Sequence, residues 1–137
     1  MFIADLMSRH VVTVNPEQDV HEIRSLFDEH QFHHLLVVEG RRLVGVISDR
    51  DVLRSISPFI DTLAERMQDR ATLRKKAHQI MSRDLIVAHA GQSVAWAAST
   101  MLEHGISCLP VVTHDGRLEG IVSWRDILRA VVEDSKG

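Results

Sequence analysis

Two short stretches of this chain decide its fold: GVISDRD at residues 45–51 and GIVSWRD at residues 120–126. Both stretches follow an apolar, β-branched run, LLVV at residues 35–38 and LPVV at residues 109–112. The residues between run and stretch also correspond, apart from one extra residue in the second turn. Self-similarity in a constant order indicates one folding unit that is used twice.

The duplication extends over residues 3–57 and 77–132. We therefore divide the chain into repeat 1 at residues 1–57, a linker at residues 58–76, and repeat 2 at residues 77–137. One copy is too small to bury a sheet alone. We expect an α+β fold in which two pseudo-symmetric repeats pack sheet to sheet, joined by a helical linker whose charges face solvent.

Each copy predicts the order β-α-β-β-α. The first strand is a β-branched run at residues 11–14 or 85–88. In repeat 1, Asn15 precedes Pro16, an order that predicts a helix capped by Asn15. Two further strands follow as a hairpin, and a closing helix begins at Ser48 or Ser123. In the linker, residues 63–67 and 72–76 also have helical composition.

The bulk composition limits the class of protein. Hydrophobic content of 45% and charged content of 26% are typical of a soluble globular protein. A net charge of −3 argues against nucleic-acid binding through a basic face. The single cysteine, Cys108, suits a reducing compartment. No signal peptide and no apolar run of about 20 residues is present, so we expect a cytoplasmic protein that does not enter the membrane.

The polar residues that both copies keep favour ligand binding over catalysis. An aspartate carboxylate can accept two hydrogen bonds from a cis-diol, and Asp51 and Asp126 each lie three residues after a serine. Gly45 and Gly120 leave room for a close backbone approach. No set of acid, base and nucleophile is recognisable, so we expect no enzyme activity. The Ser-x-x-Asp spacing is also that of a capping box, and a purely structural function stays open.

The repeated blocks resemble a known family. They are an L/I-M-S-R opening, an H/C-L-(L/P)-V-V strand and a G-(V/I)-(I/V)-S-x-R-D ending, and all three occur in order in both copies. Together they resemble the cystathionine-β-synthase (CBS) domain, arranged as a tandem pair or Bateman module. The resemblance covers the chain except the linker and the last residues. It implies regulatory binding of AMP, ADP, ATP or S-adenosylmethionine in clefts between the repeats, and a homodimer formed through the helices.

The resemblance also implies which residues bind the ligand. The aspartate would bind the ribose hydroxyls, the serine the ribose or phosphate, and the arginine the phosphate. The first cleft would use Thr13, Val14, Phe32, His33, Ser123, Arg125 and Asp126. The second cleft would use Val87, Ala88, Ile106, Ser107, Ser48, Arg50 and Asp51. We rank the first cleft above the second because only the first has a strand hydroxyl and an aromatic ring.

Three other features have simpler interpretations. The histidines at positions 30, 33 and 34 span a helix end and a strand without a zinc-ligand spacing, so we expect no metal site. Cys108 precedes a buried strand and is expected to be a packed thiol. Trp124 is expected at the surface or in a dimer contact, with stacking on a ligand as the alternative.

The sequence thus supports one leading hypothesis and two others. The leading hypothesis is a stand-alone CBS pair that binds an adenosine-type nucleotide and signals to a separate, unknown effector protein. The alternative is a ligand-free dimerisation or adaptor module in which the serines and aspartates serve only as helix caps. The third hypothesis is a hydrolase.

Overall fold

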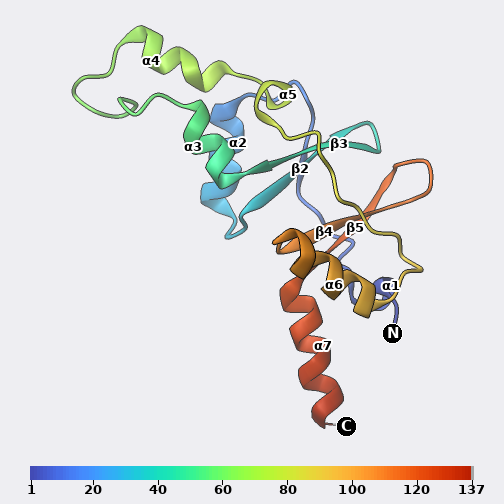
Figure 1. The fold of residues 1–137 in the computed structure, drawn as a ribbon. Helices are drawn as coiled ribbons and strands as arrows, with labels where there is room; N and C mark the ends of the chain where they lie inside the picture. The colour runs from blue at the N-terminus through green and yellow to red at the C-terminus, as the bar shows by residue number, and fades with distance from the viewer. Residues whose placement is uncertain (137) are drawn as a thin grey trace. The chain divides into compact units, whose positions relative to one another are not determined.

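The elements form two separately packed units in the computed structural model, which describes residues 1–136 (Figure 1). The continuous unit consists of Val12–Leu85. The discontinuous unit combines Met1–Val11 with Ile86–Gly137. Both units mix small sheets with helices, which confirms the expected α+β class.

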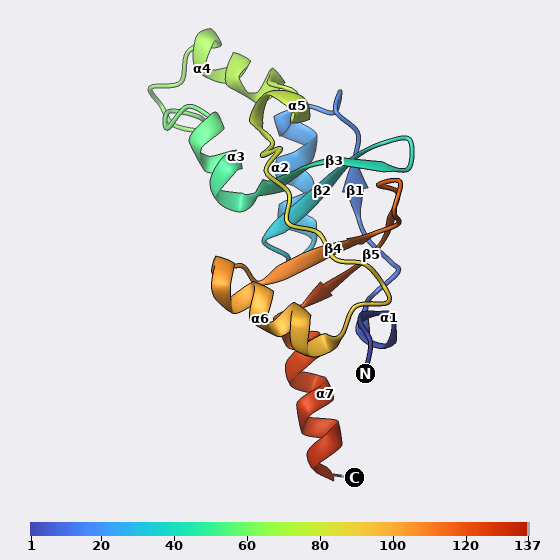
Figure 2. The ribbon, with the colours of Figure 1, turned by 45° about the vertical axis from the view of Figure 1, so that its right-hand side comes forward.

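The continuous unit contains a sheet in the order β1-β2-β3. Its strands and first helices are β1 (Thr13–Val14), α2 (Val20–Glu29), β2 (His34–Glu39), β3 (Arg42–Ser48) and α3 (Asp49–Ser55). β1 runs parallel to β2, with Thr13 opposite Leu36, and β3 runs antiparallel, with His34 opposite Ser48. The start of β2 and the end of β3 therefore lie at one end of the sheet, whereas β1 begins two residues further along β2; the three strands are labelled in Figure 2.

A single apolar cluster holds the continuous unit together. It joins one face of α2, through Val20 and Ile23, to Leu35, Val37 and Ile47 of the sheet. All five side chains are fully buried. The linker contributes Leu73 and repeat 2 contributes Ala77 to the same cluster.

The discontinuous unit repeats this plan with fewer strands. Its elements are α1 (Ile3–Leu6), α6 (Val94–His104), β4 (Cys108–Val112), β5 (Leu118–Ser123) and α7 (Trp124–Lys136). β4 and β5 are antiparallel, with Cys108 opposite Ser123. The strand expected at residues 85–88 is reduced to one parallel bridge, between Ala88 and Val111. Ile3, Ala97, Leu109, Val111 and Val122 form the core.

The two repeats exchange their opening segments. Ser8, from the start of repeat 1, forms two backbone hydrogen bonds of 2.9 Å with Ile121 in the discontinuous unit. Ser82, from the start of repeat 2, pairs in the same way with Val46 in the continuous unit, at 2.8 and 3.0 Å. The units defined by packing therefore differ from the repeats defined by sequence.

The exchange explains the two glycines that precede the serine motifs. A Cβ on Gly120 would lie 2.5 Å from the Ser8 carbonyl oxygen, and one on Gly45 would collide with the Met81 side chain. A close backbone approach is thus confirmed at Gly120, whereas a side chain approaches Gly45. The group that approaches is the exchanged segment of the same chain.

The start of α2 differs from the prediction. The helix begins at Val20 and its N-cap is Asp19, whose carboxylate accepts a hydrogen bond of 2.9 Å from the Glu22 N–H. Asn15 instead caps a separate turn. The prediction was wrong because the Val20 N–H donates to the Lys75 carbonyl, at 2.7 Å, and Asp19 is bridged to Lys76, which keeps Asp19 extended.

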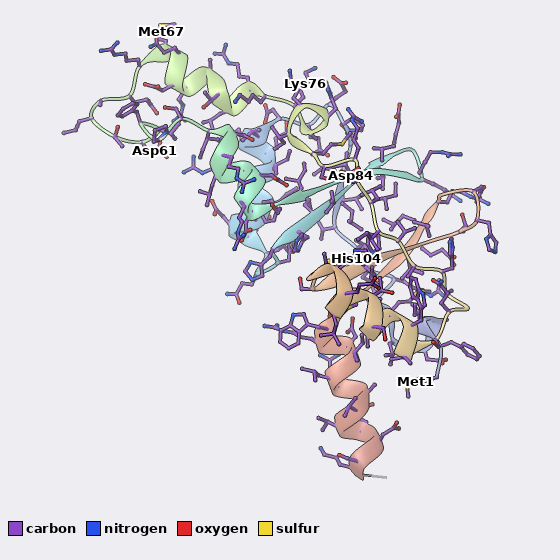
Figure 3. The ribbon with its side chains drawn as sticks, viewed as in Figure 1. Met1, Asp61, Met67, Lys76, Asp84 and His104 are labelled. Carbon is purple, nitrogen blue, oxygen red and sulfur yellow. The ribbon has the colours of Figure 1, made fainter. Side chains whose placement is uncertain are left out.

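The linker is ordered but its helices are displaced from the predicted positions. It contains α4 (Met67–Ala71) and a 3-10 turn η1 (Thr72–Arg74), and repeat 2 then begins with α5 (Ala77–Ile80). Contrary to the prediction, residues 63–64 form a turn and residues 65–66 have no regular structure, and Asp61 has a φ of 60°. Asp61 and the first residue of α4, Met67, are labelled in Figure 3. The Asp61 carboxylate accepts hydrogen bonds from Arg24 and Arg70, which hold this region on α2.

Among residues 1–136, no helix combines the length and the apolar character needed to cross a membrane.

Candidate ligand-binding site

The predicted site residues of the continuous unit gather at one end of its sheet. Thr13 begins β1, Phe32 and His33 precede β2, and Ser48 ends β3. The Asp49 N–H donates to the His33 carbonyl at 3.1 Å and so closes this end of the sheet. Val14 is 1% exposed, so only its backbone is available to a ligand.

Ser48 and Asp51 form a reciprocal cap at the start of α3. The Ser48 N–H donates to Oδ2 of Asp51 at 2.8 Å, and the Asp51 N–H donates to Oγ of Ser48 at 3.1 Å. The capping interpretation is therefore confirmed. Within residues 1–136, Oδ1 of Asp51 has no hydrogen-bond or ion-pair partner. The cap thus leaves one carboxylate oxygen for another donor.

The discontinuous unit builds the same cap. Oδ2 of Asp126 accepts from the N–H and the hydroxyl of Ser123, at 2.8 and 3.0 Å. The Asp126 side chain is 19% exposed, and its Oδ1 lies 3.7 Å from Nη1 of Arg129. The Trp124 N–H donates to the Ser107 carbonyl at 3.0 Å, as Asp49 does to His33. The two sites differ because the second oxygen of Asp126 already faces a cation.

The structure groups the predicted residues by unit. The residues that belong to the continuous unit are Thr13, Val14, Phe32, His33, Ser48, Arg50 and Asp51. Those that belong to the discontinuous unit are Val87, Ala88, Ile106, Ser107, Ser123, Arg125 and Asp126. The sequence analysis had grouped the strand residues of each repeat with the aspartate of the other, and that assignment stays a prediction. Ala88, which is fully buried, offers only its backbone.

Sequence reasoning missed an ion pair beside the first cap. Nδ1 of His33 lies 3.0 Å from Oδ2 of Asp49. This hydrogen bond lowers the pKa of Asp49 below its usual range, so the carboxylate is ionised at neutral pH. The sequence did contain one indication of this contact: Asp49 aligns with Trp124, so only one of the two repeats has a charged residue at this position.

Trp124 has a partner within its own unit. Its ring lies 5.7 Å from the guanidinium carbon of Arg125, a distance suited to a cation–π interaction. The Trp124 residue is 47% exposed, as expected for a surface position. Arg125 is thereby held beside the second cap.

The histidine cluster of the continuous unit does not converge on one point. The His30 ring stacks on Phe32, with centroids 5.1 Å apart, whereas His33 contacts Asp49. In the described part of the chain, no group of histidine, cysteine and acidic side chains is arranged to hold a metal ion. Burial raises the pKa of the Cys108 thiol, which keeps it protonated at neutral pH.

Solved structures of similar proteins share this fold over nearly the whole chain. The CBS domain pair of protein MJ0100, in complex with 5′-methylthioadenosine and S-adenosyl-L-methionine, is 27% identical with a TM-score of 0.77, covering 98% of each chain. CBSX2 in complex with AMP is also 27% identical, with a TM-score of 0.82 and the same coverage.

Among curated proteins, the uncharacterized protein MJ1225 of Methanocaldococcus jannaschii is 29% identical over 93% of this chain and 46% of its own length. The inosine-5′-monophosphate dehydrogenase of Korarchaeum cryptofilum is 34% identical over 87% of this chain and 22% of its own length. The chain therefore spans less than half the length of these relatives.

The family model named CBS domain matches twice, at residues 3–58 and 77–133, and so covers both repeats. The order of strands, the paired caps and this double match agree: the chain belongs to the CBS domain family and contains a tandem pair of CBS domains.

Proposed function

We propose that the protein binds an adenosine-type ligand at the capped ends of its two sheets and that occupancy regulates a separate effector protein. The observation that carries this proposal is the half-buried aspartate of each cap, whose Oδ1 takes no part in the cap hydrogen bonds. Ionised acceptors make strong hydrogen bonds to ribose hydroxyls. The ligands of MJ0100 and CBSX2, which are adenosine derivatives, support the same class of ligand here.

Each side chain in the proposed site has a distinct function. Asp51 and Asp126 accept hydrogen bonds from the ribose hydroxyls, and the hydroxyls of Ser48 and Ser123 lie beside them. Arg50 and Arg125 bind phosphate when the ligand carries it. The adenine contacts the strand ends, through the side chains of Thr13, Phe32, His33, Ile106 and Ser107 and the backbone of Val14, Val87 and Ala88.

Calorimetric titration with AMP, ADP, ATP and S-adenosylmethionine tests the proposal. We expect at least one of them to bind, and Asp51→Ala and Asp126→Ala each to abolish binding at one site. Glu39→Ala is the matched control, because Glu39 ends β2 at the opposite end of the sheet. The absence of binding by all four ligands at millimolar concentration would refute the proposal.

A double-mutant comparison decides how the site residues are grouped. If Thr13 serves the site of its own unit, Thr13→Val weakens binding in the Asp126→Ala background and has no effect in the Asp51→Ala background. The grouping expected from the sequence predicts the reverse. Stoichiometry from the same titrations gives the number of occupied sites.

The alternative function, a ligand-free adaptor, is favoured by the caps themselves. Both serines and both aspartates already satisfy the free N–H groups at a helix start. If capping is their only function, Asp126→Ala lowers the free energy of unfolding by about 1 kcal/mol. In that case no adenosine compound raises the melting temperature of the unmutated protein.

We also propose a homodimer formed through the helices. Leu128, Val131 and Val132 of α7 are 50–59% exposed, and Leu53 of α3 is 70% exposed. In the continuous unit, a hollow of about 210 Å³ between α2 and α3 is lined largely by Phe27, Val52, Leu53 and Ile56. Light scattering should give the mass of a dimer for the unmutated protein and that of a monomer for Leu53→Glu or Leu128→Glu. A monomer in both cases would refute the dimer.

We expect the protein to act in the cytoplasm, where adenine nucleotides are abundant. We also expect no catalytic turnover of the ligand, because binding and release are sufficient for regulation. Incubation with ATP followed by chromatography would reveal hydrolysis.

A further inference from the structure

The two proposed sites form a controlled comparison within one molecule. The helix that follows each cap serine begins DRDVLR at residues 49–54 and WRDILR at residues 124–129. Both sequences share the Arg-Asp-x-x-Arg pattern, so their charged residues are the same except at the first position. That position holds Asp49 in the continuous unit and Trp124 in the discontinuous unit.

The same backbone hydrogen bond fixes these two residues in place. The Asp49 N–H donates to the carbonyl of His33, the residue before β2, at 3.1 Å, and the Trp124 N–H donates to the carbonyl of Ser107, the residue before β4, at 3.0 Å. The difference between the units is therefore one of chemistry at an equivalent position. One unit carries an imidazole and a carboxylate there, and the other carries a hydroxyl and an indole.

Asp49 adds one negative charge beside the first cap. Its carboxylate is 48% exposed and ionised, Nδ1 of His33 lies 3.0 Å from it, and His34 is also near it. Trp124 adds no charge, and its ring instead holds the Arg125 guanidinium at 5.7 Å. The second cap also has Arg129 at 3.7 Å from Asp126. The surroundings of the second cap are therefore the more positive.

Resting on the proposed function, we propose that Asp49 weakens the binding of 5′-phosphorylated adenosine ligands at the Asp51 site relative to ligands without a phosphate, and that the Asp126 site lacks this bias. Asp49 stands between Ser48 and Asp51 in the chain, and we take about 8 Å as the separation between its carboxylate and the phosphate of a ligand held by that cap. At that distance in water, one unit charge changes affinity about twofold, and a phosphate with nearly two charges about fivefold.

The test isolates one site and removes one charge. In the Asp126→Ala background, AMP and 5′-methylthioadenosine are titrated into the protein with and without Asp49→Asn. We expect Asp49→Asn to strengthen AMP binding about fivefold at low ionic strength and to change 5′-methylthioadenosine binding less than twofold. The gain for AMP should shrink at about 1 M salt, where the Debye length is about 3 Å.

Glu39→Gln removes the same charge at the far end of the same sheet and should leave both affinities unchanged. The reciprocal test compares Trp124→Asn with Trp124→Asp in the Asp51→Ala background. These variants lose the same ring and differ only in charge, so AMP should bind about fivefold more weakly to Trp124→Asp.

Equal AMP affinities in both matched pairs would overturn the inference while leaving the proposed function intact. Equal gains for AMP and 5′-methylthioadenosine on Asp49→Asn would also overturn it, because the effect would then not depend on the phosphate. If neither AMP nor 5′-methylthioadenosine binds the unmutated protein, the selectivity inference is overturned; the proposed function fails as well only if ADP, ATP and S-adenosylmethionine also do not bind.

Discussion

Gly120 and Gly45 show how single residues hold the exchanged segments. A methyl group on Gly120 would meet the backbone oxygen of Ser8, which two hydrogen bonds fix in place. A methyl group on Gly45 would meet the flexible side chain of Met81. The same substitution should therefore have unequal consequences in the two units.

We predict that Gly120→Ala lowers the free energy of unfolding by about 1–3 kcal/mol, as for other overpacked sites. Gly45→Ala should cost less, since Met81 can change rotamer. Gly91→Ala is the control, because a Cβ there meets no atom within 4 Å. Chemical denaturation of the three variants measures the order, and equal losses for Gly120→Ala and Gly91→Ala would contradict the prediction.

His34 gives the continuous unit a dependence on pH. Burial lowers the pKa of His34, and the nearby Asp49 carboxylate opposes this effect only in part. The folded protein then binds a proton at His34 less readily than the unfolded chain does. Its contribution to stability is therefore complete above the usual histidine pKa of about 6.5 and is lost as the pH falls below it.

Thermal melts between pH 7.5 and pH 5.5 test this prediction. We expect the melting temperature to fall toward pH 5.5 and the fall to be smaller for His34→Gln. His10→Gln, at an exposed position, is the control. Identical pH profiles for His34→Gln and the unmutated protein would show that another group is responsible.

At the residue scale, the sequence predicted the caps but not the charges around them. A Ser-x-x-Asp spacing is local, so both capping boxes could be recognised from four residues. The ion pair of His33 with Asp49 joins residues from different elements. It depends on the register of β2 against β3, which no local pattern specifies.

At the scale of elements, long periodic segments were predicted well and their boundaries less well. The hairpins and closing helices are present where the apolar runs placed them. The start of α2 shifted, and the helix predicted at residues 72–76 ends at Arg74, because the backbone of Val20 pairs with that of Lys75. The first strand of repeat 2 shortened to a single bridge at Ala88.

The true start of α2 can be checked by removing its cap. Asp19→Ala should lower the free energy of unfolding by about 1 kcal/mol, because the Glu22 N–H loses its acceptor. Asp28→Ala, near the last turn of the same helix, should be nearly neutral. Denaturant titration compares the two, and equal effects would argue against Asp19 as the N-cap.

At the scale of the molecule, the exchange of opening segments could not be foreseen from the duplication. Sequence similarity defines repeats by descent, whereas packing assigns residues to whichever strands they contact. Only the structure shows that Val12–Leu85 is packed as one unit although its last residues come from repeat 2.

Fragments of the chain can distinguish the division into packed units from the division into sequence repeats. A fragment of Val12–Leu85 retains the Leu73 and Ala77 contacts and the Ser82 pairing, so we expect cooperative thermal unfolding. A fragment of residues 1–57 lacks all three and should not unfold cooperatively. Circular dichroism compares them, and a cooperative transition in the shorter fragment alone would contradict the prediction.

The exchange also orders events during synthesis on the ribosome. The continuous unit is complete once Leu85 has emerged and can fold while the rest is still being translated. Met1–Val11, although made earlier, belongs to the discontinuous unit, whose other residues are translated after Leu85. Translation therefore leaves this segment, with the apolar side chain of Ile3, unprotected for longer than any part of the continuous unit, and a chaperone acting on the nascent chain would encounter it first.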